Sequence, residues 1–549
     1  MKKKLLYILP LTILFMVSCK KQLDINVDPN NPLELSESRL LPAVQYNLGY
    51  SLSIGGGLSN ILQVYTHQMT TRENADQYGI TGSDFYIQEA WNGLYKDVLT
   101  NTNFIIKNGT ENGNLKYVGI AKVIKAYTFS QLVDVFGDVP FTEANQLVEG
   151  VFSAKFDDDA EIYPQLIIML DEAIADLNNT EAANVLTPGT DDVMYGGNTS
   201  LWVKAANTLK LKLYTQQRLV KDVSSEVNAL INSGKLISAT DESFLVPFGP
   251  NGATDDRNPG FGDYYATQRS NHVSPWFYEI MKGYNTGIYE GIEDPRIPYY
   301  IYNQLEPTAD DPGAEYKDGG FVSMYFGSVG PDRDKNAQNY ISLFGIYPVG
   351  GRYDDGKGGT ASATSGTGAA PYRLITYADR LFLEAELMES GVIAGDSKAK
   401  FEAAVREAFK QVDYVVNEFV KPSQTVPTLV GTDEVEAYIT SILSSFDNNP
   451  SRQLEYIMTQ KWLSSFGSAV DQYTDYRRTG YPVLFNPKDP LMAPGGFVTP
   501  PEDGLKPVPV QLNRSYPLSL PWFQTELQTN ENAPSQKTDL STYKVFWLP

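Results

Sequence analysis

Apolar residues recur every three or four positions along two parts of the chain, residues 117–235 and 374–480, and this spacing predicts amphipathic helices. Gly137 and Pro140 follow the first predicted helix and are expected to end it, because glycine accepts a left-handed backbone and proline fixes the next φ. Ser200 is expected to be the N-cap of the third helix. The predicted helices cover residues 117–136, 161–177, 200–220, 224–234, 375–390, 398–416, 434–444 and 452–466.

Most of these helices form pairs joined by short turns. Neither helix of a pair can bury its apolar face alone, so we expect a mainly α-helical fold of stacked, tetratricopeptide-like hairpins. Residues 240–373, which lie between the two helical parts, are rich in Gly, Pro, Asp and Tyr and show little helical periodicity. Because this stretch is too long for an ordinary connector, we predict a large, irregular, loop-rich insertion that carries the ligand face. The proline-rich residues 482–549 are predicted to wrap around the scaffold.

The N-terminus has the features of a bacterial export signal: three lysines, a short apolar run, and Ser18 before Cys19. The apolar run is too short to span a bilayer, which takes roughly 20 residues. Cys19 is the only cysteine of the chain, so an internal disulfide is impossible, and we interpret it as the site of lipid attachment. The alternative is a signal peptide with an incidental cysteine. We therefore predict a signal peptide at 1–18, a lipidated tether at 19–32 and a single domain at 33–549.

The chain is strongly acidic, with 66 Asp and Glu against 44 Lys and Arg and a formal net charge of -22. Such a surface repels nucleic acids and anionic lipids, which leaves the lipid at Cys19 as the only expected membrane attachment. Aromatic residues make up 12% of the chain, including 35 tyrosines and 6 tryptophans. Flat rings with a polar tip suit sugars or peptide side chains. The alternative is a tyrosine-rich surface that binds no ligand.

The residues that common catalytic sites require are missing from the sequence. The only histidines are His67 and His272, and HExxH, CxxC and GxSxG motifs do not occur. A segment similar to a phosphate-binding loop, residues 351–358, ends in Gly358 where magnesium binding needs Ser or Thr. We therefore expect no catalysis, no metal site and no cofactor. Paired carboxylates for glycoside hydrolysis remain open, because the separation that they require is spatial.

Seven segments follow one another from the signal to the C-terminus: LDINVDPNNP at 23–32, YTFSQLVDVFGDVPFTEA at 127–144, DPR at 294–296, LITYADRLFLEAELMESG at 374–391, QKW at 460–462, DYRRTGYP at 475–482 and NRSYP at 513–517. In this order they resemble the SusD/RagB family, the surface nutrient-binding lipoproteins of Bacteroidetes, in its SusD-like branch. Tyr473 stands where that family usually has tryptophan.

The resemblance implies a SusD-like fold with four tetratricopeptide-like units and no catalytic role. It implies a lipoprotein at the cell surface that sits on a SusC-like TonB-dependent outer-membrane transporter. The protein would capture an oligosaccharide or an oligopeptide and deliver it to the transporter. The residues leave two alternatives open, a surface glycoside hydrolase and a structural or adhesion protein. Arg477 and Arg478 are expected to have a structural role, at a helix C-terminus or paired with buried acids.

The chemistry of sugar recognition indicates two stretches as the ligand site, 67–91 and 263–289, because each combines aromatic rings with amides, guanidinium groups and carboxylates. Trp91 and Tyr95 have the spacing of one helix face, so core packing is the alternative for Trp91. Trp276 follows Ser274 and Pro275 in a polar loop, which is consistent with either exposure or packing. The candidate ligand-binding residues are Arg72, Asn74, Tyr78, Tyr86, Trp91, Tyr264, Arg269, Asn271, Trp276, Tyr284 and Tyr289.

Overall fold

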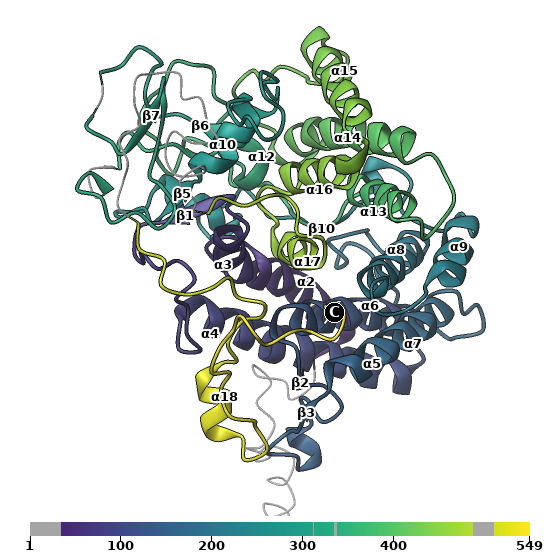
Figure 1. Ribbon diagram of the computed structural model, residues 1–549. Helices are drawn as coiled ribbons and strands as arrows, with labels where there is room; N and C mark the ends of the chain where they lie inside the picture. Colours follow the sequence, from purple (N-terminus) through teal and green to yellow (C-terminus); the bar gives the residue numbers. More distant parts are fainter. Residues whose placement is uncertain (1–34, 311, 334–337, 487–509) are drawn as a thin grey trace, which may run out of the picture.

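Helices from three parts of the chain enclose the core of this computed structural model, which describes residues 35–310, 312–333, 338–486 and 510–549. The predicted signal peptide, Cys19, the tether and residues 487–509 of the predicted wrap lie outside the described residues. Figure 1 shows the helices on the right and below, the loop-rich region at the upper left, and the C-terminal segment running down the left side. The mainly α-helical, tetratricopeptide-like fold predicted above is confirmed.

Both predicted helical parts are present. The first contains α6 (Leu115–Phe136), α7 (Asp159–Leu177), α8 (Thr199–Gln217) and α9 (Ser224–Asn232). The second contains α13 (Tyr377–Glu389), α14 (Ser397–Tyr414), η6 (Val415–Val420), α15 (Asp433–Asn448), η7 (Pro450–Arg452), α16 (Gln453–Ser464) and α17 (Val470–Thr479). Helix α6 packs against α7, and α13 against α14, as antiparallel hairpins do; the two parts meet where α8 contacts α13 and α6 contacts α17.

Two predicted helix starts are corrected. The side chain of Asn198, not of Ser200, caps α8, because its oxygen accepts the N–H of Ser200 at 3.1 Å and Thr199 is already helical. Ile375 belongs to a strand, β10 (Tyr372–Ile375), which pairs with β4 (Phe244–Val246). Helix α13 therefore begins only after Thr376, whose hydroxyl forms a capping box with Asp379.

A third set of helices precedes residue 113 and was not predicted. These helices pack against α6 in succession: α5 contacts α6, and α2 contacts α5. Helix α3 is buried on all sides and contacts α17 and α4. The set comprises α2 (Glu37–Leu52), α3 (Leu58–Tyr65), α4 (Phe85–Asn92), η1 (Gly93–Leu99) and α5 (Thr100–Asn112).

The region 240–373 is irregular, as expected. Its helices are short: η3 (Thr240–Glu242), η4 (Pro259–Tyr264), α10 (Pro275–Lys282), α11 (Ile297–Tyr300) and α12 (Ile346–Val349). Its strands form two-stranded antiparallel sheets that pair β6 (Ile301–Tyr302) with β9 (Leu343–Phe344) and β7 (Tyr316–Asp318) with β8 (Phe321–Ser323). A further pair, β1 (Met69–Thr71) with β5 (Asn271–Val273), joins this region to the N-terminal helices.

The chain turns sharply after α6, as the sequence predicts. Gly137 has a φ of 73° and is followed by β2 (Val139–Pro140), which pairs with β3 (Phe156–Asp157). A short helix, η2 (Leu147–Glu149), lies in the loop between these strands. The described part of the C-terminal segment contains α18 (Gln524–Thr529) and is fixed to the core by the buried side chains of Leu520 and Trp547.

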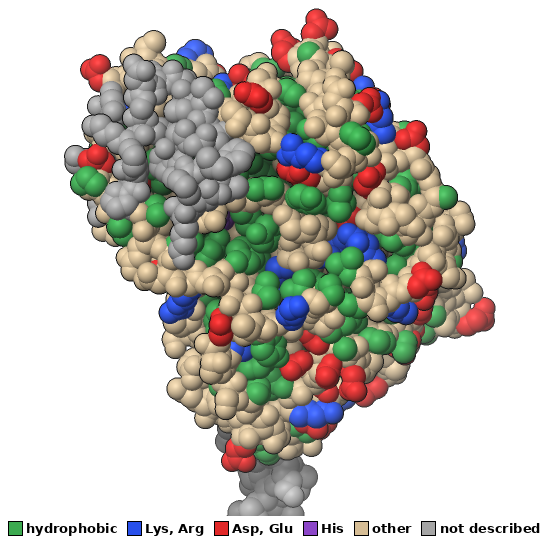
Figure 2. Space-filling view, viewed as in Figure 1, with side chains coloured by type: hydrophobic (Ala, Val, Ile, Leu, Met, Phe, Trp, Pro, Cys, Tyr) green, Lys and Arg blue, Asp and Glu red, His purple; other side chains and the backbone are tan. Residues whose placement is uncertain are grey.

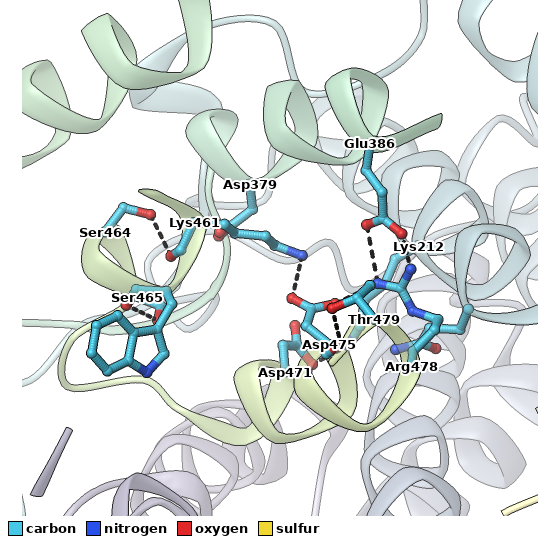
Figure 3. A network of polar contacts seen from close by, with 12 residues as sticks. Lys212, Asp379, Glu386, Lys461, Ser464, Ser465, Asp471, Asp475, Arg478 and Thr479 are labelled. Atoms are coloured by element: carbon cyan, nitrogen blue, oxygen red, sulfur yellow. Dashed lines mark hydrogen bonds and ion pairs between the residues drawn. The ribbon is translucent and has the colours of Figure 1, made fainter. Parts of the chain in front are cut away.

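A buried network of charges fixes α17 among the other helices (Figure 3). The ammonium of Lys461 on α16 lies 2.7 Å from a carboxylate oxygen of Asp475, and Arg478 donates to the other oxygen of that carboxylate at 2.6 Å. Lys212 on α8 pairs with Asp471 at 2.5 Å. The expected structural role of the two arginines is confirmed, since Arg477 also donates to the carbonyl of Leu518 at 2.7 Å.

Candidate functional site

A three-residue ladder brings together the two stretches that the sequence indicates as the ligand site. In the antiparallel pairing of β1 with β5, Thr71 lies opposite Asn271. The ladder is extended by the backbone N–H of Arg72, which donates to the carbonyl of Ser270 at 3.0 Å. Residues just after β1 and just before β5 are therefore neighbours at the surface.

A hollow of about 290 Å³ opens beside this ladder, and we call it the ladder pocket. Three of the candidate residues line it together: Asn74 and Tyr86 from the first stretch and Asn271 from the second. Its other polar lining residues include Asn60, Thr71, Glu73, Gln77, Asp84 and Ser270. The pocket thus combines amides, two carboxylates and an aromatic ring, the set of groups that hydroxyl-rich ligands require.

Local structure holds the charged groups of the ladder pocket in place. Asp84 is the N-cap of α4 and accepts the N–H of Tyr86 at 3.0 Å; burial nevertheless raises the pKa of Asp84. Burial also acts against ionisation of Glu73, but a hydrogen bond from Ser270 and the charge of Arg72 outweigh it and lower the pKa of Glu73. Burial, reinforced by nearby carboxylates, raises the pKa of Tyr86 to about 12, so its phenol keeps the proton at neutral pH.

Two other candidates lie next to the ladder pocket. Arg72 is partly exposed and forms an ion pair with Glu73 at 3.3 Å. Tyr78 is buried, and its hydroxyl lies 2.7 Å from Nε2 of His67. Burial lowers the pKa of His67 to about 3, so the imidazole is neutral in this contact.

Four further candidates are also buried, so their side chains are not presented to a ligand. Trp91 packs on Phe136, with ring centroids 5.2 Å apart, which agrees with the core-packing alternative. Tyr264 donates to the carbonyl of Phe344 at 2.5 Å, and Tyr289 donates to the carbonyl of Tyr456 at 3.3 Å. Tyr264 fills space between the loops of 240–373, and Tyr289 fills space between these loops and α16.

The guanidinium of Arg269, the fourth of these buried candidates, serves the backbone. It donates to the carbonyl of Asp263 at 2.5 Å and to that of Tyr264 at 3.2 Å. A buried arginine needs such acceptors, because its five N–H groups cannot be left without hydrogen bonds. We therefore assign Arg269 to the support of the loop before β5.

The last two candidates lie away from the ladder pocket. Trp276 is buried, and its indole N–H donates to the carbonyl of Val483 at 3.1 Å; it lines a separate, mostly apolar hollow of about 310 Å³. Tyr284 is partly exposed, and its hydroxyl donates to Asp318 at 3.0 Å. The structure therefore does not gather all the candidates into one aromatic platform.

The structure adds residues that the sequence interpretation missed. Asn60, Ile61, Val64 and Tyr65, all on α3, form one side of the ladder pocket. Phe85, the first residue of α4, is 60% exposed and packs edge-on against Tyr86, with ring centroids 5.2 Å apart.

Possible metal ligands occur together at one place in the described residues. Carboxylate oxygens of Asp138, Asp158 and Asp159 lie within 4.8 Å of one another. Protein groups already bind each of them: Asp138 accepts from the N–H of Asp159, Asp158 caps α7, and Asp159 accepts from the N–H of Phe546, all at about 3 Å. These contacts explain the cluster as a structural joint between α6, α7 and the C-terminus.

None of the helices in the described ranges combines the length and the apolar character that crossing a bilayer requires. The surface that Figure 2 shows is mixed: apolar side chains emerge along its middle, interspersed with basic ones, and many acidic side chains lie towards its edges.

Comparisons with solved structures agree with the architecture. A SusD/RagB family protein from Bacteroides thetaiotaomicron is 20% identical, with a TM-score of 0.65, over 94% of this chain and 99% of that one. A SusD homolog from Bacteroides fragilis is 21% identical, with a TM-score of 0.65, over 94% and 100%. A chitin-binding SusD homolog from Flavobacterium johnsoniae is 19% identical, with a TM-score of 0.64, over 93% and 98%. At these identities the likeness establishes the fold.

A search of curated proteins finds no match. A family model, SusD-like_2, described as starch-binding and associating with the outer membrane, matches residues 29–497. This match covers most of the chain and includes both helical parts, the ladder pocket and the loop-rich region. The chain therefore belongs to the SusD-like family.

Proposed function

We propose that this protein is a non-catalytic glycan receptor of the outer cell surface. It binds an oligosaccharide in the ladder pocket and passes it to a SusC-like TonB-dependent transporter. Cys19 carries the lipid that holds it at the outer membrane. The family's description as starch-binding and outer-membrane-associated supports this function, and so does the export signal in the sequence.

The observation that carries the proposal is the composition of the ladder pocket. Amide groups of Asn74, Gln77 and Asn271 can each donate and accept, as sugar hydroxyls do. The ring of Tyr86 lines the pocket, and the exposed ring of Phe85 packs edge-on against it, so both offer apolar faces for stacking. A glycan is favoured over a peptide because chitin-binding proteins share this fold and the family description names starch.

Two carboxylates line the pocket, as a glycoside hydrolase would also need. Both already serve the protein: Asp84 caps α4, and Glu73 accepts from the hydroxyl of Thr71 at 3.2 Å. We propose that their remaining lone pairs accept hydrogen bonds from sugar hydroxyls and that neither transfers a proton to the glycosidic bond.

Isothermal titration calorimetry with starch and chitin oligosaccharides, and with peptides of similar length, tests the proposal. The variants Asn74→Ala and Tyr86→Ala are expected to weaken glycan binding about five- to twenty-fold, since each removes a hydrogen-bonding or stacking group. Tyr265→Ala is the matched control, because Tyr265 is 42% exposed and lies outside the ladder pocket.

Four outcomes would contradict the proposal. Binding of peptides alone would refute the ligand class, and release of shorter sugars from a bound glycan would show catalysis. Failure of the full-length lipoprotein to co-purify with a TonB-dependent barrel would refute the delivery step. A deletion strain that grows normally on every bound glycan would favour a structural or adhesion role.

A further inference from the structure

A second and larger hollow lies beside the ladder pocket, and we call it the C-terminal pocket. Its volume is about 520 Å³, and it is enclosed between the turn at residues 78–83 and the C-terminal segment at residues 513–541. Figure 1 shows this segment passing α3 and α4 on its way to α18. Backbone contacts fix it there: Gln524 donates to the carbonyl of Gly82 at 2.9 Å, and Leu520 to that of Val135 at 2.7 Å.

The two pockets share a wall. Ile80 lines both of them, and Tyr65 and Tyr78, which lie on either side of this wall, have ring centroids 5.5 Å apart. The hydroxyl of Tyr65 is buried and has no hydrogen-bond partner among the described residues. Burial raises the pKa of this phenol well above its usual value. Among the nearby charges, Asp84 of the ladder pocket raises this pKa further and Arg514 of the C-terminal pocket lowers it. A donor without a partner thus lies where the two pockets meet.

The lining of the C-terminal pocket is polar and has little net charge. Arg514 and Asp539 contribute one charge of each sign, and the amine of Lys537, which also lines the pocket, donates to the carbonyls of Phe136 at 2.6 Å and Leu520 at 2.7 Å. The side chains of Ser83, Asn513, Ser515 and Gln524 make no hydrogen bond to any other part of the chain that the structure describes. Pro517, Pro521 and Tyr78 add apolar surface. Unused amides and hydroxyls next to apolar patches are suited to a neutral, hydroxyl-rich ligand.

We propose that the C-terminal pocket is a second compartment of the ligand site and takes the further sugar units of a neutral oligosaccharide whose first units occupy the ladder pocket. This inference rests on the proposed function, since it requires a glycan in the ladder pocket. The protein selects longer glycans, because only these reach past Ile80 and Tyr65 to the side chains of the C-terminal segment that make no hydrogen bond to other described residues.

A chain-length series tests the second compartment. Oligosaccharides of two to eight units, of the class that binds, are titrated into the full-length protein without its lipid, into Gln524→Ala and into Ser515→Trp. The longest members are expected to bind wild type at least ten-fold more tightly than the disaccharide. Gln524→Ala should weaken only the long members, about three- to ten-fold, because it removes one hydrogen-bonding group. Ser515→Trp should abolish the advantage of length by filling the pocket.

The matched control is Gln528→Ala, which changes an exposed glutamine one turn later on the same helix, outside the pocket. It should leave the whole series unchanged, and equal melting temperatures of all variants exclude misfolding. If both variants bind the long glycans as wild type does, the second compartment is refuted while the proposed function stands. If no glycan of any length binds to wild type, the proposed function itself fails. If the variants weaken short and long members equally, the C-terminal pocket does not bind only the further sugar units, and the inference is refuted.

Discussion

Arg478 on α17 donates a hydrogen bond of 3.0 Å to Glu386 on α13, and both side chains are fully buried. The same carboxylate accepts from Nε of Arg218, at the end of α8, at 2.8 Å. One buried glutamate therefore balances two guanidinium groups from different parts of the scaffold. The contact connects the DYRRTG segment, identified from the sequence by family resemblance, to the interface between the two helical parts.

Glu386→Gln is expected to destabilise the protein by about 3–5 kcal/mol, because it removes the carboxylate that pairs with Arg218 and leaves Arg478 only Asp475, which Lys461 shares. Chemical denaturation followed by circular dichroism measures the change. Glu402→Gln, which removes the partner of Arg406 in an exposed i,i+4 pair on α14, should cost no more than about 0.5 kcal/mol. Equal effects of the two changes would show that the buried network does not stabilise the helices.

Gly137→Ala should destabilise the protein by about 2–4 kcal/mol, since the turn after α6 needs a φ of 73° with a ψ of -123°, which glycine adopts readily, and an added Cβ would lie 2.7 Å from the ring of Tyr543. Gly391 has a nearly identical φ of 70°, but nothing lies within 4 Å of its added Cβ. Gly391→Ala should therefore cost only about 1 kcal/mol. Thermal melting of both variants separates backbone strain from the contact, and a larger loss for Gly391→Ala would contradict this account.

Glu279 makes stability depend on pH. Burial, followed by the nearby charge of Asp318, raises its pKa to about 8 from an ordinary value of 4.5. The folded state thus holds a proton that the unfolded state has released, so this group adds stability as pH falls from about 8 to 4.5. Glu279→Gln is neutral at every pH and should exceed wild type by about 3–5 kcal/mol at pH 9, with the difference vanishing near pH 4.5.

Urea denaturation at several pH values measures this difference. Glu531→Gln, at an exposed position, controls for the loss of one negative charge. A pH-independent difference between wild type and Glu279→Gln would refute the assignment.

Phe85→Ala should weaken glycan binding about five-fold without lowering the melting temperature, because the ring is mostly exposed beside the ladder pocket. Phe104, on α5, is 41% exposed, and Phe104→Ala is the matched control for loss of a surface ring. Calorimetry with the tightest-binding oligosaccharide makes the comparison. An equal loss for both variants would indicate a non-specific effect of surface aromatics.

Helices α6 to α9 and α13 to α16 were predictable from their recurring apolar positions, and α6 also from its stop at Gly137, whereas α17 and the short helices of 240–373 were not predicted. The earlier helices lack that pattern. Helix α3 is buried on every side and so shows no polar face, α2 contains Pro42, and α5 has only Phe104, Ile105 and Ile106 as large apolar residues. In these helices tertiary packing outweighs local periodicity.

The candidate site was predictable as two stretches, but not residue by residue. Composition indicates that rings and amides are frequent near residues 70 and 270, whereas the inward or outward direction of each ring depends on tertiary contacts. Trp91 points inward because it packs on Phe136, and Tyr264 points inward because its hydroxyl donates to the carbonyl of Phe344. The ladder between β1 and β5 is only three residues long and leaves no recognisable pattern in the sequence.

The last described segment of the chain forms one wall of the C-terminal pocket while Leu520 and Trp547 anchor it in the core. Substitutions at the pocket-lining positions between these anchors would change the wall of the pocket while the anchors stay in place. If this pocket holds glycan as we propose, the preference for one polymer over another can diversify through the tail of the polypeptide while the helical scaffold stays constant.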